Sequence, residues 1–276
     1  MDRYDRNGLT FDVLDEGPID GEIVVLLHGY PETKEMWEKV IPAITGAGYR
    51  VLAPDQRGYS PGARPRGRWA YRQSELVADV VAMVDAAGGD GFHVAGHDWG
   101  GAVAWALATA HPDRVRSLTV LSTPHPKAML RSMVTSGQAL RSWYMFFYQF
   151  PVIADFSTTG PNRRLFRRTL VGSGLAESRV DAYLERFGTR RDLAPLNNWY
   201  RAMPLTRPKR YAPVTVPTTY VYSTDDFALG RKAADLTGRY VSGPYRYEVL
   251  EGVSHWIPDD RPDDVARLIL ERVGAG

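Results

Sequence analysis

Residues 92–110 read FHVAGHDWGGAVAWALATA, and this stretch decides the fold. Its first residues, Phe92–Ala95, predict a short strand. The alanine-rich residues Gly100–Ala110 predict a helix. Between them, Gly96–Gly100 predicts a sharp strand-to-helix turn, because glycine tolerates the close approach of neighbouring backbone. Asp98 takes the position at which such a turn presents a nucleophile.

The same alternation of strands and helices continues on both sides of this turn. Further strands are predicted at Ile23–Leu27, Arg50–Ala53, Val115–Leu121, Thr218–Tyr222 and Arg246–Leu250. Further helices are predicted at Lys34–Thr45, Ser74–Ala87, Arg231–Arg239 and Asp263–Val273. Strands that alternate with helices indicate an α/β fold with a parallel sheet and helices on both of its faces.

The alternation stops over residues 128–207, which are helical in pattern and rich in aromatic residues and arginine. We therefore predict a core domain of residues 1–127 and 208–276 and an inserted helical cap (lid) domain of residues 128–207. The stretch 131–210 carries a net charge of +9 in a chain whose total is +2. Such a stretch is either a solvated helical surface or a surface that attracts anionic ligands.

Composition excludes several classes of protein. The 276 residues include 34 basic and 32 acidic ones, so the chain is not a strongly basic nucleic-acid binder. It contains no cysteine, which excludes disulfides, thiolate metal sites and a cysteine nucleophile. We see neither a secretory leader nor an apolar stretch of about 18 residues, and we expect a cytoplasmic protein without a membrane span.

An aspartate at the nucleophile position indicates a particular chemistry. A carboxylate that attacks an sp³ carbon forms an alkyl ester, and an activated water can then hydrolyse that ester at its carbonyl. A serine would form an ether, which water does not easily cleave. Asp98 therefore favours the opening of an epoxide or the displacement of a halide over ester hydrolysis. The alternative role for Asp98 is a cap on the helix that follows.

His255 is the candidate general base, because it follows the last predicted strand and precedes the last predicted helix. In isolation it reads equally well as a histidine of a surface loop. The loop Ser223–Leu229 offers Asp225 or Asp226 to orient the imidazole. The alternative for this loop is an acidic turn that caps a helix. With Asp98, the chain order is nucleophile, acid, histidine.

The segment His28–Pro31 follows the predicted strand Ile23–Leu27. A turn at the carboxyl end of a strand can aim a backbone N–H group at a developing oxyanion. We predict that the Tyr30 N–H fills this role together with the Trp99 N–H. The alternative is an ordinary turn that Pro31 shapes.

Four segments together resemble the α/β-hydrolase superfamily over nearly the whole chain, and within it the epoxide hydrolases with an α-helical cap. They are His28-Gly-Tyr-Pro31, Asp55-Gln-Arg-Gly-Tyr-Ser60, Gly96–Gly101 and Ser223–Leu229. The resemblance implies a mostly parallel sheet of eight strands and a reaction without a cofactor or a metal. In the last segment the family's aspartate lies two residues before Ala-Leu, which favours Asp226.

The resemblance also implies two cap tyrosines whose hydroxyls hold the epoxide oxygen. The segment 142–149 points to Tyr144, with Tyr148 as the competitor, and the segment 195–201 points to Tyr200. A phenol is a suitable donor to the oxygen that leaves carbon, because its pKa lies near ~10.

The other cap aromatics are predicted to pack the cap on the core and to bind substrate. The expected packing stripe is Trp143, Phe146, Phe147 and Phe150, and the expected contacts to a hydrophobic, aryl-bearing epoxide are Trp143, Phe147 and Trp199.

Two other functions stay open. Haloalkane and haloacid dehalogenases resemble this chain in the nucleophile and the triad, but they hold the halide with groups for which this chain has Tyr30, Trp143 and Tyr144. A non-catalytic ligand-binding protein of the same fold is the second alternative. For an enzyme, the expected partners are a small hydrophobic epoxide and water, with no nucleic acid, and a homodimer is left open.

Overall fold

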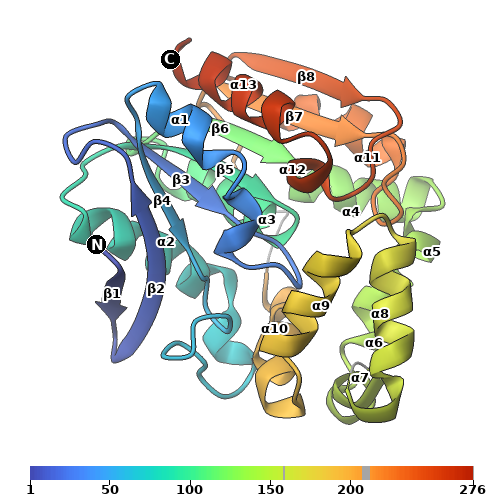
Figure 1. The fold of residues 1–276 in the computed structure, drawn as a ribbon. Helices are drawn as coiled ribbons and strands as arrows, with labels where there is room; N and C mark the ends of the chain where they lie inside the picture. Colours follow the sequence, from blue (N-terminus) through green and yellow to red (C-terminus); the bar gives the residue numbers. More distant parts are fainter. Residues whose placement is uncertain (158, 207–211, 276) are drawn as a thin grey trace.

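A mostly parallel sheet of eight strands lies at the centre of the computed structural model, as the sequence predicts (Figure 1). The structure describes residues 1–157, 159–206 and 212–275. The strands are β1 (Arg3–Arg6), β2 (Leu9–Glu16), β3 (Ile23–Leu27), β4 (Arg50–Pro54), β5 (Phe92–His97), β6 (Val115–Leu121), β7 (Thr218–Ser223) and β8 (Tyr245–Leu250). Their order is β1-β2-β4-β3-β5-β6-β7-β8. Strands β3 to β8 pair in parallel, while β2 pairs antiparallel with both β1 and β4.

The first two strands lie outside the strands predicted from apolar runs. Tyr4, Phe11 and Val13 are buried, but charged residues stand between them along the chain. Asn7 and Gly8 both have positive φ, 51° and 76°, as a two-residue hairpin turn requires. The dipeptide Asn-Gly is therefore the signal that would have identified this hairpin.

Helices cover both faces of the sheet. Successive side chains of β3 point to opposite faces and therefore pack against different helices. Val25 and Leu27 pack in a core cluster with residues of α2 (Gln73–Ala86) and α3 (Trp99–Ala110). Val24 and Leu26 pack in a second cluster with residues of α1 (Ile41–Gly46) and α13 (Pro262–Val273). The remaining core helices are α11 (Arg231–Thr237), α12 (Ile257–Asp260) and the 3₁₀ helices η1 (Lys34–Trp37), η2 (Arg68–Tyr71) and η6 (Gly238–Tyr240).

The continuous helix predicted at Lys34–Thr45 is wrong. The chain forms the 3₁₀ helix η1 and then a separate helix, α1, which starts at Ile41 with Pro42 in its first turn. Proline has no N–H to donate to a preceding turn, so it is placed best where a helix begins.

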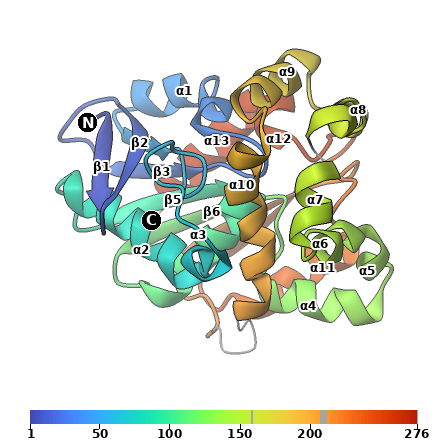
Figure 2. The same cartoon turned by 90° about the horizontal axis from the view of Figure 1, so that it is seen from below.

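The helices between β6 and β7 are α4 (Pro126–Thr135), α5 (Gln138–Arg141), α6 (Trp143–Phe147), α7 (Pro151–Ser157), η3 (Gly160–Asn162), α8 (Arg163–Gly172), α9 (Glu177–Arg186), α10 (Arg190–Ala202) and η4 (Met203–Leu205). In the view of Figure 1, α4 and α5 lie at the right of the sheet, while α6 to α10 lie below it, on the side from which Figure 2 is seen. Within the described part of 128–207 the chain forms no strand. The division into core and cap stays a prediction, and its second boundary, at 207 and 208, lies outside the described residues.

The predicted packing stripe of the cap is wrong for most of its members. Trp143, Phe146 and Phe150 are 63%, 60% and 59% exposed. The reason is the break of this segment into the short helices α6 and α7, which turns Tyr144 and Tyr148 inward instead.

None of the helices in the described ranges is both long enough and apolar enough to cross a bilayer.

Candidate active site

Asp98 lies in the sharp turn between β5 and α3, as the sequence predicts for this stretch. Its backbone has φ 49° and ψ −117°, a strained conformation for a residue with a side chain. A Cβ atom at Gly96 would collide with the backbone of Gly100, and one at Gly100 would collide with the backbone of Leu27. The turn can therefore form only with glycine at these two positions.

The backbone of β3 continues into a turn that faces Asp98. The Tyr30 N–H donates to Asp98 Oδ1 over 2.9 Å, and the Tyr30–Pro31 peptide bond is cis. Trp99 opens α3, where backbone N–H groups have no partner within the helix. The Tyr30 N–H thus lies beside the carboxyl group of Asp98, and Trp99 follows Asp98 directly in the chain, with its N–H in the first turn of α3.

His255 stands between two carboxylates. Its Nδ1 lies 2.7 Å from Asp226 Oδ2, and its Nε2 lies 3.7 Å from Asp98 Oδ2. The other oxygen of Asp226 accepts hydrogen bonds from the N–H groups of Ala228 and Leu229, at 2.7 and 2.9 Å. Asp225 is exposed and does not face the imidazole. The geometry therefore supports Asp226 as the acid.

These neighbours determine the charge of the imidazole. Burial alone would lower the pKa of His255, but the Asp226 carboxylate opposes it, and with Asp98 it raises the pKa to about 9. Burial would raise the pKa of Asp226, yet His255 and two backbone N–H groups hold it below its usual range. At neutral pH the imidazole of His255 is therefore protonated while the carboxyl group of Asp226 is ionised.

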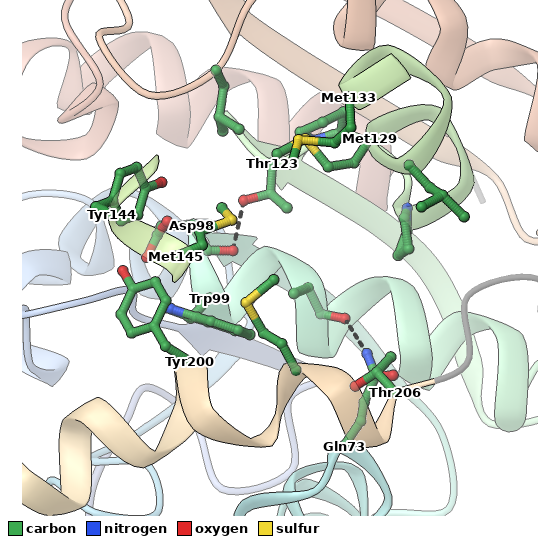
Figure 3. A pocket seen from close by; sticks show the side chains of 16 residues that line it. Gln73, Asp98, Trp99, Thr123, Met129, Met133, Tyr144, Met145, Tyr200 and Thr206 are labelled. Carbon is green, nitrogen blue, oxygen red and sulfur yellow. Dashed lines mark hydrogen bonds between the residues drawn. The ribbon is translucent and has the colours of Figure 1, made fainter. Parts of the chain in front are cut away.

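Tyr144 of α6 and Tyr200 of α10 lie on either side of Asp98 in one cavity (Figure 3). Their rings meet edge to face, with centroids 5.9 Å apart. Within the described ranges neither hydroxyl makes a hydrogen bond. Burial, and then the charge of Asp98, raises the pKa of each phenol well above its usual value. Both hydroxyls therefore stay protonated and can donate.

Tyr148, the competitor of Tyr144, is engaged elsewhere. Its hydroxyl lies 3.0 Å from the Tyr30 hydroxyl, which also donates to Asn197 Oδ1 over 3.1 Å. Asn197 in turn donates to Asp155 Oδ1 over 2.9 Å. Tyr148 thus belongs to a buried polar network between core and cap, and it does not line the cavity.

The cavity has a volume of about 260 Å³ and a mostly apolar lining. Four methionines contribute to that lining: Met129, Met133, Met145 and Met203. Asp98 is the one charged side chain among the described lining residues. Thioether side chains are flexible and adapt to ligands of different shape.

The three aromatic residues predicted to bind substrate lie outside this lining. Trp143 is exposed, Phe147 is half-buried beside it, and Trp199 is buried against Trp99 with its Nε1 donating to the Arg57 carbonyl. In α6 it is Tyr144 and Met145 that face the cavity. The sequence-based hint of an aryl-bearing substrate therefore loses its support.

The sequence analysis missed a buried pair behind the base. His97 Nδ1 lies 2.9 Å from Glu32 Oε2, and His97 Nε2 lies 2.8 Å from the carbonyl oxygen of His255. Ser122, with φ 70°, places its Oγ 2.9 Å from Asp226 Oδ2. These contacts hold the loop of His255 in place. The position of Glu32 directly after the segment His28–Pro31 is the signal that was available.

No group of three His, Asp or Glu side chains in the described ranges is arranged to bind a metal ion.

Comparison with known proteins identifies the family of this chain. A family model described as alpha/beta hydrolase fold matches residues 22–262. Epoxide hydrolase A of Mycobacterium tuberculosis is 32% identical over 97% of this chain and 95% of its own length. The AB hydrolase superfamily protein YfhM of Bacillus subtilis is 35% identical over 96% of this chain and 94% of its own length.

Among solved structures, epoxide hydrolase A of Mycobacterium thermoresistibile superimposes with a TM-score of 0.84. It is 29% identical in sequence, and the match covers 99% of this chain and 97% of that structure. The superposition covers nearly the whole chain, so the match includes the sheet, the turn at Asp98 and the loop of His255. This chain belongs to the α/β-hydrolase family.

Proposed function

We propose that this protein is an epoxide hydrolase, which converts an epoxide and water into a vicinal diol. The observation that carries the proposal is the pair of phenol hydroxyls beside Asp98, in an apolar cavity that the nucleophile shares. The names of the relatives reported above support the same reaction.

In the first step an oxygen of Asp98 bonds to one ring carbon while the carbon–oxygen bond of the epoxide breaks. Tyr144 and Tyr200 donate hydrogen bonds to the leaving oxygen, and one of them gives up its proton to it. The product of this step is a β-hydroxyalkyl ester on Asp98. Two neutral donors suit this step, because negative charge develops on the ring oxygen only as the bond breaks.

In the second step His255 takes a proton from water, and the hydroxide attacks the carbonyl carbon of the ester. The N–H groups of Tyr30 and Trp99 stabilise the tetrahedral oxyanion. The intermediate expels the diol, whose oxygen receives the proton from His255. The carboxyl proton left on Asp98 replaces the one that the tyrosine lost. His255 takes back from solvent the proton that it released after the first step, and the site returns to its starting state.

Esterification of Asp98 makes His255 available as the base of the second step. The free site holds His255 protonated, because its pKa is about 9. Once Asp98 is an ester, one of the two negative charges beside the imidazole is gone, and the pKa of His255 falls. The imidazole can then release its proton and accept one from water.

The alternative of a dehalogenase receives less support from the cavity. The Trp99 indole in the lining offers one N–H donor, but the paired phenol hydroxyls of Tyr144 and Tyr200 suit a departing oxygen better than a halide. The substrate is accordingly an epoxide, small and hydrophobic. We keep the cytoplasm as the proposed compartment, on the evidence of the sequence.

The direct test is diol formation from a panel of neutral alkyl and aryl epoxides, measured by gas chromatography with mass detection. We expect diol from the wild-type protein and none above background from Asp98→Ala. Failure of the whole panel, or unchanged turnover by Asp98→Ala, would overturn the proposal. Halide release from alkyl halides would then be the next assay.

A further inference from the structure

The cap carries an unusual surface of large apolar side chains. Nine of the thirteen exposed large hydrophobic side chains of the described residues lie between Val134 and Leu165. We call seven of them the cap face: Trp143, Phe146, Phe150, Val152, Ile153, Phe156 and Leu165, which are 54–66% exposed. Large apolar patches are rare on monomeric soluble proteins, and where they occur they indicate an interaction site.

The elements that carry the cap face are neighbours in space. Helices α6, α7 and α8 all lie at the lower right of Figure 1, and Figure 2 shows α7 between α6 and α8. The 3₁₀ helix η3 contacts both α7 and α8. The apolar side chains are therefore grouped on one part of the cap.

Positive charge accompanies this apolar surface. Arg164 and Arg168 of α8 are exposed and flank Leu165 in sequence, and neither forms an ion pair within the described ranges. The acidic residues next to α8, Glu177 and Asp181, are already paired with Arg167. An exposed helix face that joins leucine and aromatic residues with unpaired arginine is typical of proteins that lie on an anionic membrane surface.

The positive charge near the cap face also argues against a second copy of this chain as its occupant. A symmetric dimer through the cap face would bring the same patch of two copies together, and with it the unpaired arginines of both. The segment 131–210 has a net charge of +9, so like charges would meet at low ionic strength. Anionic lipid headgroups complement this charge instead.

One short helix connects the cap face with the cavity. In α6, Trp143 and Phe146 point to the outside, while Tyr144 and Met145 line the cavity. A substrate dissolved in a bilayer would therefore have a single helix between it and the nucleophile. This last point rests on the proposed function, whereas the docking of the surface does not.

We propose that the cap face docks on an anionic membrane surface. The aromatic side chains enter the headgroup region, and arginines such as Arg164 and Arg168 pair with lipid phosphates.

The test is co-sedimentation of the full-length protein with two kinds of vesicle, one of phosphatidylcholine and one with about a third of phosphatidylglycerol. We expect at least about tenfold tighter binding to the anionic vesicles at low salt, with a loss of binding as salt is added. The apolar variant F146S/F150S/I153S should lose most of this binding. The charge variant R164Q/R168Q should weaken it about fivefold for each arginine removed.

Matched controls exist elsewhere on the surface. I19S/W69S replaces equally exposed apolar side chains, and R66Q/R68Q replaces exposed arginines of the core. Both controls should bind as the wild type does, and thermal melting should show that all variants are folded. These measurements do not depend on activity, so a failed assay for diol leaves this proposal intact.

Two outcomes would overturn the proposal. The first is equal or absent binding of the wild type to both kinds of vesicle. The second is a dimer in light scattering that F146S/F150S/I153S abolishes, since the cap face would then be an interface between copies of this chain.

Discussion

Asp98 changes its charge during the proposed reaction, and His255 lies close enough to respond, with Nε2 3.7 Å from Asp98 Oδ2. The imidazole is also tied to Asp226 at 2.7 Å, which fixes its orientation. At the residue scale, then, nucleophile and base are coupled by electrostatics as well as by position.

This coupling predicts the behaviour of His255→Gln. The variant keeps the nucleophile but lacks the base, so Asp98 should be alkylated and the ester should persist. Incubation with an epoxide substrate should raise the intact mass by one substrate, and peptide mapping should place the adduct on Asp98. The double variant with Asp98→Ala is the control and should gain no mass. Normal turnover without an adduct would contradict the roles of both residues.

The cap hydroxyls give a second prediction. Tyr144→Phe and Tyr200→Phe should each lower kcat for ring opening by roughly 100-fold, the cost typical of losing one donor to a developing oxyanion. Tyr148→Phe is the matched control, because its hydroxyl is engaged with Tyr30 and its ring would remain. The control should lose about 1 kcal/mol of stability and little kcat. Equal losses of kcat in all three variants would show that Tyr144 and Tyr200 have no special role in ring opening.

The charge of His255 predicts the pH dependence of the second step. Hydrolysis needs the neutral imidazole, so the rate of ester decay should rise with pH and then level off. Loss of the Asp98 charge lowers the pKa of His255 in the ester, so the midpoint should lie below about 9. Single-turnover measurements from pH 5 to pH 9 test this point. A decay rate that falls as pH rises would contradict a basic role for His255.

At the scale of elements, ion pairs attach the cap to the core. Arg186 of α9 lies 2.5 Å from Asp55, a fully buried carboxylate that Lys34 also contacts at 2.6 Å. Burial alone would raise the pKa of Asp55, but Arg186 and Lys34 help to hold it below its usual range. The carboxylate therefore stabilises the folded state above its unfolded pKa, and this contribution is lost as the pH falls.

Asp55→Asn should remove the ion pairs that Asp55 forms with Arg186 and Lys34. Removing one partner of a buried ion pair costs about 3 kcal/mol, which corresponds to a fall in Tm of roughly 5–10 °C. The loss should be largest near neutral pH and shrink toward pH 3, where the wild-type carboxylate is also being protonated. Calorimetry against the exposed control Asp20→Asn measures it. An unchanged Tm at pH 7 would show that Asp55 does not hold the cap.

Elements also show what the sequence could predict. Strand β3 follows from the uninterrupted apolar run Ile23–Leu27, because a strand buried on both faces favours apolar residues throughout. The other parallel strands carry some polar residues and follow from the alternation of strands with helices. The hairpin of β1 and β2 has charged residues between its buried ones, which hides it from the criterion of an apolar run. The orientation of the cap helices is harder to predict from sequence, because these helices are short and their packing determines which side chains face inward. Thus the exposure of Trp143 contradicts its apolar pattern.

Within the candidate site, too, sequence patterns predict some residues and not others. Asp98 and His255 are marked by their places after strands, and geometry supports the local register that favours Asp226. The choice between Tyr144 and Tyr148 depends on a network that joins Tyr30 of the core to the cap. No local pattern contains that information, since the partners are more than a hundred residues apart.

At the scale of the whole molecule, the cavity between core and cap predicts a preference among epoxides. Its described lining has no cation, and its one charge is the carboxylate of Asp98. A substrate with a carboxylate near the ring would bring two negative charges into an apolar space. Neutral alkyl epoxides should therefore have at least about tenfold higher kcat/KM than carboxylated analogues of equal length. Equal kcat/KM values for a matched pair would contradict this account of the cavity.

The proposed diol forms by hydrolysis of an ester on Asp98, and oxygen labelling distinguishes this route from direct attack of water on the epoxide. Enzyme in excess over epoxide is allowed one turnover in H₂¹⁸O, and the diol and the Asp98 peptide are analysed by mass spectrometry. Water attacks the ester carbonyl in our account, so the first diol should carry no ¹⁸O and the label should appear on Asp98. A diol labelled in the first turnover would show direct attack of water on the epoxide and would contradict the mechanism.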